Sequence, residues 1–405
     1  MSEIEQSRCV FSCGLSSQHP LDCRIRKGVT VSKACLPVTI SELVGNNGVV
    51  TANYSISPAS IGAMNAVGLN EEAVSGWIAE LGVGATTPLT FERIGNGQSN
   101  LTYSVTDAGG GRWVLRRPPL GTLLASAHDV VREHRILSSL QGTPVPVPKI
   151  IGITEDPAIT DAPLVLMSYV DGLVIDGVSV AQKLTVDERR KVGLALPKAL
   201  ATIHAVDLEE TALQDLASTK PFAQRQLKRW SAQWDKSKTR EVPDVERLAE
   251  ILNRNIPEQT EVTLVHGDFH LNNIIVDPAE GRVLAVVDWE LCTLGDPLAD
   301  LGALLAYWPE AGDKVAGPFM ASTLEGFPNR DELVEAYVAA TGRDVSAVGY
   351  WHVLALWKLS IIAEGVLRRI LDDPRNKAEQ GGPTVTLIDG IVARAVSTAE
   401  KLGLN

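Results

Sequence analysis

Residues 263–290, TLVHGDFHLNNIIVDPAEGRVLAVVDWE, decide the fold of this chain. Short apolar runs predict strands at 262–265, 274–276 and 283–287, each too short to be a helix. Between the last two runs, the sequence DPAEG at 277–281 contains the Asp, Pro and Gly that are typical of a turn. The segment therefore predicts a compact set of short strands joined by polar loops.

Three oxygen-bearing side chains stand where these strands begin or end, namely Asp268, Asn273 and Asp288. Because the strands are neighbours, we expect the three side chains to converge on one point. Oxygen ligands of this kind suit Mg²⁺, which prefers one or two protein ligands completed by substrate phosphates and water. A carboxylate that is not itself a ligand can accept the proton of an attacking hydroxyl.

A glycine-rich hairpin is predicted nearer the N-terminus. Strand-like runs at 90–94, 101–106 and 113–117 flank the sequence GNGQSN at 95–100 and a turn at 107–111. Glycines in such a loop allow backbone N–H groups to approach phosphate oxygens. An ordinary hairpin turn without a ligand explains this pattern equally well.

A carboxylate is predicted on the apolar face of the next helix. In the helix expected at 127–140, Glu133 shares a face with Val130 and Leu137 through three- and four-residue spacings. An unpaired buried carboxylate is costly, so it should have a cationic partner. Arg116 or Arg117 could supply it, depending on which face of their strand points inward, and a glutamate at the helix margin that reaches solvent is the alternative.

Together these motifs resemble the aminoglycoside phosphotransferase and choline kinase-like family, which are small-molecule relatives of protein kinases. The likeness covers roughly 89–305, and the offset from Asp268 to Asn273 equals that between the Asp and Asn of the protein-kinase catalytic loop. It is carried in order by Gly97-x-Ser99-Asn100, Arg116, Glu133, His266-Gly267-Asp268-x-His270-x-x-Asn273 and Asp288-Trp289-Glu290.

The resemblance implies an α+β, protein kinase-like fold with two lobes. We expect an antiparallel-sheet N-lobe over 67–170, with the glycine-rich loop, and a mainly helical C-lobe over 171–405, with the catalytic loop. Residues 1–66 mix Gly, Asn, Ser and Pro without periodicity, which predicts a poorly ordered extension. The extension holds four of the five cysteines, whose spacing matches no tight metal-binding pair.

The resemblance also implies roles for single residues in a reaction that uses ATP and Mg²⁺. Asp268 would be the catalytic base, while Asn273 and Asp288 would hold magnesium. Glu290 would face the acceptor, and His266 would support the loop by hydrogen bonding. The expected nucleotide contacts are Ser99, Asn100, Arg116, Glu133, Met167 and Tyr169.

Two positions depart from the pattern. The family usually carries Lys where Arg116 stands, and this exchange is not neutral because arginine binds bidentately. Gly267 replaces the arginine with which protein kinases bind a phosphorylated activation loop. We therefore expect a small-molecule kinase that is assembled without a phosphorylation switch.

Composition limits the partners and the compartment. The chain has 405 residues and a net charge of −12, so phosphate backbones are repelled and nucleic acid is not an expected partner. No apolar run is long enough to span a bilayer, and the N-terminus lacks the pattern of a signal peptide. These features predict a cytoplasmic protein that does not bind membranes.

The acceptor is left open by the sequence. The segments 115–119 and 132–135 resemble those of kinase-like domains fused to acyl-CoA dehydrogenases. This resemblance suggests that the acceptor is a hydroxylated acyl compound or other metabolite rather than an aminoglycoside. Arg225, Lys228 and Arg229 lie on a predicted helix that could attract an anionic group or could equally be a solvated face. One rival hypothesis is a kinase fold that binds nucleotide or acyl-CoA without transfer, and a second is a metallohydrolase using His266, Asp268 and His270.

Overall fold

The computed structural model describes residues 40–46, 49–54, 66–95, 100–120, 129–217, 220–313, 319–373 and 382–404. It divides into two units, residues 1–67 and 68–405. In the first unit, strands β1 (Ile40–Asn46) and β2 (Val49–Tyr54) pair in antiparallel fashion. The rest of the predicted extension up to residue 65, with its four cysteines, lies outside the described residues.

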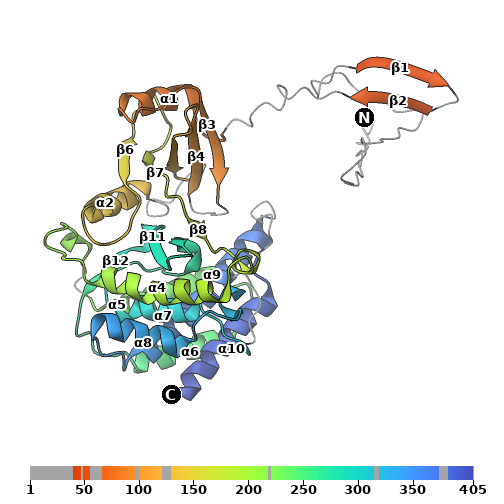
Figure 1. Ribbon diagram of the computed structural model, residues 1–405. Coiled ribbons are helices and arrows are strands. Elements are labelled where there is room, and N and C mark those ends of the chain that lie inside the picture. The colour runs from red at the N-terminus through yellow and green to blue at the C-terminus, as the bar shows by residue number, and fades with distance from the viewer. Residues whose placement is uncertain are drawn as a thin grey trace, which may run out of the picture. The chain divides into compact units, whose positions relative to one another are not determined.

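The second unit begins with a five-stranded antiparallel sheet, the N-lobe, whose strand order is β3-β4-β5-β7-β6 (Figure 1). The three strands predicted around the glycine-rich loop are confirmed, each within one residue. The strands of the sheet are β3 (Leu89–Ile94), β4 (Leu101–Asp107), β5 (Arg112–Arg117), β6 (Ile150–Thr154) and β7 (Leu164–Ser168).

Two helices accompany this sheet. Helix α1 (Glu71–Glu80) begins where the Asn70 side chain accepts the Ala73 N–H. Helix α2 (Val130–Leu140) starts later than the expected residue 127, because Asp129 is its non-helical cap and accepts the Arg132 N–H. Residues 127 and 128 lie outside the described part of the chain.

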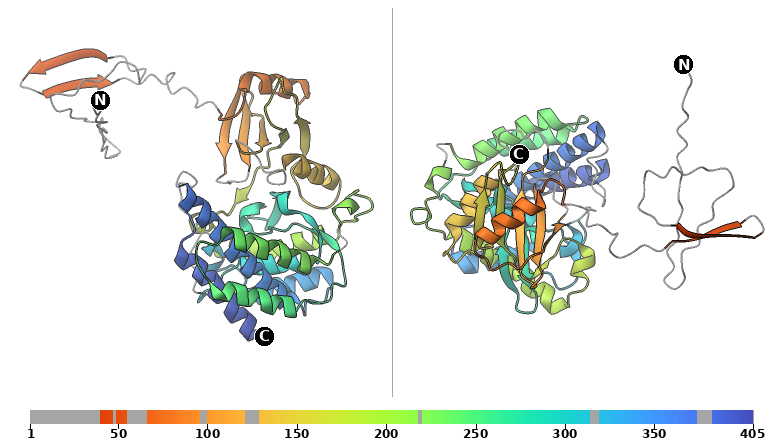
Figure 2. Two further views of the ribbon diagram at one scale, coloured as in Figure 1. Left: turned by 180° about the vertical axis from the view of Figure 1, so that it is seen from behind. Right: turned by 90° about the horizontal axis from the view of Figure 1, so that it is seen from above.

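The C-lobe is mainly helical, and Figure 2 shows its helices from behind the view of Figure 1. The expected lobe boundary at 170/171 falls between β7 and β8. The helical segments are α3 (Val178–Ala181), α4 (Val186–His204), η2 (Gln214–Leu216), α5 (Phe222–Ser237), α6 (Pro243–Arg254), α7 (Leu298–Ala306), η5 (Met320–Thr323), α8 (Arg330–Thr341), α9 (Val348–Asp372) and α10 (Val385–Lys401).

Short strands lie between this helical body and the N-lobe, as the apolar runs of 262–287 predict. They form two sheets, with the orders β11-β10-β8 and β12-β9. The elements concerned are β8 (Leu173–Val174), β9 (Thr263–Val265), η3 (Leu271–Asn273), β10 (Ile274–Asp277), β11 (Arg282–Val286), η4 (Trp289–Leu291) and β12 (Thr293–Gly295).

Helix α9 forms the centre of the C-lobe core. It packs against α5, α6, α7 and α10. Close packing against α7 depends on Gly302, where a Cβ would stand 2.5 Å from the Trp351 carbonyl carbon. This packing fixes α7 and α9 directly behind the loop that follows β9.

Candidate active site

The loop after β9 is held by histidine hydrogen bonds, as predicted for His266. Its Nε2 lies 3.0 Å from the Val287 carbonyl oxygen, and its Nδ1 accepts the Asp268 N–H at 3.2 Å. Burial lowers the pKa of His266, so the ring is neutral and donates from Nε2. His266 therefore has a structural role and is not a proton carrier.

Asp300 anchors the same loop from helix α7. Its two carboxylate oxygens accept the backbone N–H groups of His266 at 2.6 Å and Gly267 at 2.8 Å. His204 Nε2 lies 3.4 Å from one of these oxygens. Both loop amides are thus satisfied by one buried carboxylate, which gives Asp300 a structural role.

Gly267 has a left-handed backbone and no room for a side chain. Its φ is +85°, and a Cβ would lie 2.6 Å from the Leu291 carbonyl oxygen. Since that neighbour is backbone, it cannot move aside cheaply. The arginine of protein kinases could not occupy this position without moving the loop.

We expect Gly267→Ala to destabilise the protein by more than the roughly 1–2 kcal/mol of left-handed strain alone. Gly110→Ala is the matched control, because Gly110 has φ +89° and a Cβ added there would meet no atom within 4 Å. Urea unfolding of both variants measures the difference. Equal losses would show that the contact with Leu291 does not constrain the loop.

Asp268 stands at the centre of the site and accepts hydrogen bonds from two sides. Asn273 Nδ2 donates to its Oδ2 at 3.1 Å and to its carbonyl oxygen at 2.8 Å, and the Tyr307 hydroxyl donates to its Oδ1 at 3.1 Å. Burial alone would raise the pKa of Asp268, but His270 and Lys358 hold this pKa well below its usual range. The carboxylate is therefore ionised and fixed in direction.

Tyr307 is a site residue that the sequence analysis missed. Its ring lies against His270, with centroids 4.3 Å apart, and burial keeps the pKa of its hydroxyl well above the ordinary value, so it remains a donor. The available signal was periodicity, because Asp300, Ala303 and Tyr307 follow at three- and four-residue spacings on α7 and its cap. The face that anchors the loop also supplies this contact.

The register of β10 and β11 brings Asn273 next to Asp288. Ile274 pairs with Val286, and the Val287 N–H donates to the Asn273 carbonyl at 2.9 Å. Asp288 follows immediately with φ +67°, a strained conformation for a residue other than glycine. Strand pairing thus brings the backbones at Asn273 and Asp288 together, Asn273 contacts Asp268 directly, and the convergence of all three side chains stays a prediction.

Arg116, rather than Arg117, is the cation that meets Glu133. Its guanidinium lies 2.8 Å from Glu133 Oε1 and 2.8 Å from Asp288 Oδ1, and so it bridges helix α2 and the C-lobe. Arg117 points to the other face of β5, where it pairs with Asp161 at 3.0 Å. Burial raises the pKa of Glu133 to about 7, while Arg116 opposes that rise.

A second arginine fixes helix α2 against the C-lobe. The Arg132 guanidinium donates to the Glu290 carbonyl at 3.0 Å and to the Cys292 carbonyl. The Trp289 N–H also donates to Glu133 at 3.3 Å. These contacts need no phosphorylated residue, which supports the interpretation of a permanently assembled site.

The remaining residues predicted to contact the nucleotide lie in the N-lobe and directly after its strand β7, and one of them is outside the described residues. Ser99 lies outside the described residues, and Asn100 is buried with no hydrogen-bond partner for its side chain in the described part of the chain. Met167 pairs with Val114 in the N-lobe sheet and is buried, and Tyr169 follows β7 with the Arg112 guanidinium 3.5 Å above its ring centre.

A cavity of about 720 Å³ adjoins the catalytic loop at Gly267. Glu290, the residue expected to face the acceptor, lines it together with parts of α2, α5, α7 and α9.

The described residues hold no group of three or more His, Cys, Asp or Glu side chains arranged for a metal ion. Within the same residues, no helix is long and apolar enough to cross a membrane.

Comparison with solved structures identifies the fold. A Ralstonia eutropha protein with a provisional assignment as an aminoglycoside phosphotransferase superposes with a TM-score of 0.66 at 28% identity, covering 82% of this chain and 99% of that one. Wild-type aminoglycoside 2'-phosphotransferase-IIIa in its GDP complex has a TM-score of 0.51 at 15% identity, over 82% and 98% of the two chains. Both carry the two-lobed, protein kinase-like α+β fold that the sequence predicts.

Comparison with curated relatives and with a family model identifies the family of the chain. Mouse acyl-CoA dehydrogenase family member 10 is 35% identical over 74% of this chain and 28% of its own length, and human family member 11 is 31% identical over 70% and 36%. The chain thus spans about a third of the curated relatives it matches. The model described as the phosphotransferase enzyme family matches residues 90–357, so the chain belongs to that family.

Proposed function

We propose that the protein transfers the γ-phosphate of ATP to a hydroxyl group of a small molecule, with the help of Mg²⁺. The observation that carries this proposal is the position of Asp268, an ionised carboxylate beside Asn273 at the edge of a cavity. Family membership supports the reaction class. The acceptor we favour is a hydroxylated metabolite or acyl derivative, and an aminoglycoside-like compound is the alternative.

The donor set fits a magnesium ion. Asn273 and Asp288 offer amide and carboxylate oxygens from adjacent strand ends, which are ligands that Mg²⁺ accepts alongside phosphates and water. A bound magnesium ion would neutralise phosphate charge. Asp288 also pairs with Arg116, which holds this carboxylate in a fixed position beside Glu133.

The chain's own residues would orient both substrates. Asp268 would accept a hydrogen bond from the acceptor hydroxyl and take up its proton as the new oxygen–phosphorus bond forms. The bond between the γ-phosphorus and the β-phosphate oxygen breaks in the same step, and ADP leaves. Its low pKa makes Asp268 a weak base, so it contributes mainly by orienting the acceptor hydroxyl and by placing a negative charge beside it. Arg116 and the backbone of the glycine-rich loop would hold the phosphates.

An acceptor screen tests this proposal. The protein is incubated with magnesium-ATP and a panel of hydroxylated acids, acyl thioesters, alcohols and aminoglycosides, and mass spectrometry detects a phosphate adduct. We expect an adduct with at least one class. Raised melting temperature with magnesium-ATP but no adduct with any class would instead favour the nucleotide-binding alternative, which the exchange of the usual lysine for Arg116 motivates.

A further inference from the structure

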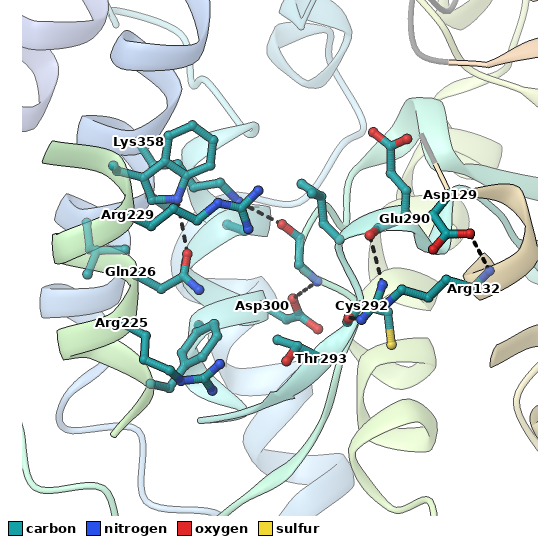
Figure 3. Close-up of a pocket in the computed structure, with 18 residues that line it drawn as sticks. Asp129, Arg132, Arg225, Gln226, Arg229, Glu290, Cys292, Thr293, Asp300 and Lys358 are labelled. Carbon is teal, nitrogen blue, oxygen red and sulfur yellow. Dashed lines mark hydrogen bonds between the residues drawn. The ribbon is translucent and has the colours of Figure 1, made fainter. Parts of the chain in front are cut away.

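The cavity beside the catalytic loop is built largely by the C-lobe (Figure 3). Helix α5 contributes Arg225 and Arg229, and helix α9 contributes Lys358, while Arg132 reaches it from α2. Its volume of about 720 Å³ lies within the range of small-molecule sites. Gly267 is part of the wall, so the cavity ends one residue from Asp268.

The four basic side chains of this cavity share one property. Within the described part of the chain, none of them lies within 4 Å of a carboxylate oxygen, although the whole chain carries a net charge of −12. By contrast, Arg190, Arg240, Arg330 and Arg343 each form an ion pair elsewhere in the C-lobe.

Main-chain carbonyls and one ring hold these cations in place. Lys358 Nζ donates to the Gly267 carbonyl at 2.9 Å, and Arg225 donates to the Leu294 carbonyl at 2.8 Å. Arg132 donates to the Glu290 carbonyl, and the Arg229 guanidinium stands 5.4 Å from the centre of the Trp230 ring. Carbonyls and rings orient a cation without neutralising its charge.

The carboxylates that line the cavity are engaged elsewhere. Both oxygens of Asp300 accept the loop amides, and Asp129 caps helix α2. The negative charge of Glu290 raises the pKa values of Arg116 and Glu133. Its carboxylate points away from Arg225 in Figure 3. Among the described residues, Arg225 and Arg229 are therefore left without a carboxylate partner, while the charge of Lys358 also interacts with Asp268 and Asp300.

We propose that this cavity binds the acceptor through an anionic group, a carboxylate or a phosphate, held by Arg225, Arg229 and Lys358. The inference rests on the proposed function and names its substrate class. Guanidinium groups bind such anions bidentately, and partial burial strengthens the attraction. A cationic aminoglycoside would meet like charge here.

Four probes of one chain length test the proposal: ω-hydroxyhexanoate, ω-hydroxyhexyl phosphate, hexanediol and ω-aminohexanol, with the corresponding decane series to vary reach. Phosphorylation with magnesium-ATP is followed by mass spectrometry. We expect kcat/KM at least ten-fold higher for an anionic probe than for the diol or the amino alcohol. The better of the two anions identifies carboxylate or phosphate as the group recognised.

Charge-removing variants separate recognition from catalysis. Arg225→Gln and Arg229→Gln should raise KM for the anionic probe ten-fold or more and leave the diol unaffected, because neither side chain contacts Asp268 or its loop. Lys228→Gln is the control, because Lys228 is exposed on the same helix and does not line the cavity. It should change neither value.

The outcomes distinguish this inference from the proposed function. Equal or better transfer to the diol or the amino alcohol would overturn anion recognition while the kinase activity stands. If no probe is phosphorylated, calorimetric titration of the two anions decides: heat that Arg225→Gln and Arg229→Gln abolish supports the anion site, and absence of heat refutes it.

Discussion

Asp268→Asn is expected to reduce phosphoryl transfer by about 10²–10⁴-fold, the usual contribution of a positioned general base. Asparagine keeps one oxygen that can accept from Asn273, and its NH2 group can donate to the Tyr307 hydroxyl oxygen, so the loop should remain folded. What disappears is the negative charge and the capacity to take up a proton. Turnover under saturating magnesium-ATP measures the loss.

Two controls make the Asp268→Asn result specific. Asp277→Asn changes a carboxylate at the far end of β10, outside the site, and should leave turnover unchanged. The rise in melting temperature with magnesium-ATP should persist in Asp268→Asn, because this residue is not expected to hold the nucleotide. Turnover near that of the wild type would show that Asp268 is not the base.

Arg116→Met is expected to lower the free energy of unfolding by about 3–5 kcal/mol, as for other buried pairs that lose one partner. The substitution leaves the side chain of Glu133, which is 3% exposed, without its cation, and it also removes the contact to Asp288. Arg112→Met on the same strand is the control, since Arg112 is exposed and its guanidinium lies over the Tyr169 ring.

The loss in free energy of unfolding caused by Arg116→Met should increase with pH. Burial raises the pKa of Glu133 to about 7, so its contribution to stability is complete below the ordinary carboxyl pKa and declines as pH rises through 7. Without Arg116 this pKa rises further. Urea unfolding at pH 6 and pH 8 should therefore show a larger difference in Arg116→Met than in the wild type.

The double variant Arg116→Met with Glu133→Leu completes this test. Replacing both partners by apolar groups should recover most of the lost stability while leaving nucleotide affinity low. Failure of the double variant to recover stability would mean that the ion pair is not the source of the loss. Recovery of both properties would remove Arg116 from the nucleotide site.

The sequence alone determined the fold class and the segment of short strands and polar loops in which the candidate site lies. Strand length and turn residues are local properties, so the runs at 262–287 and the polar positions 268, 273 and 288 could be predicted from neighbouring residues. Motif order then indicated a two-lobed kinase-like fold, which the family model and the solved structures confirm. The start of α2 differs from the predicted start by a few residues, because the capping side chain of Asp129 determines where the helix begins.

Only the tertiary structure decided which distant groups meet. The sequence left Arg116 and Arg117 as equal partners for Glu133, because strand alternation does not say which face points to the cleft. Tyr307 and Lys358 reach the catalytic loop from α7 and α9, and nothing local to Asp268 specifies them. The charge of the cavity likewise depends on which cations remain unpaired after packing, and packing joins elements far apart in the chain.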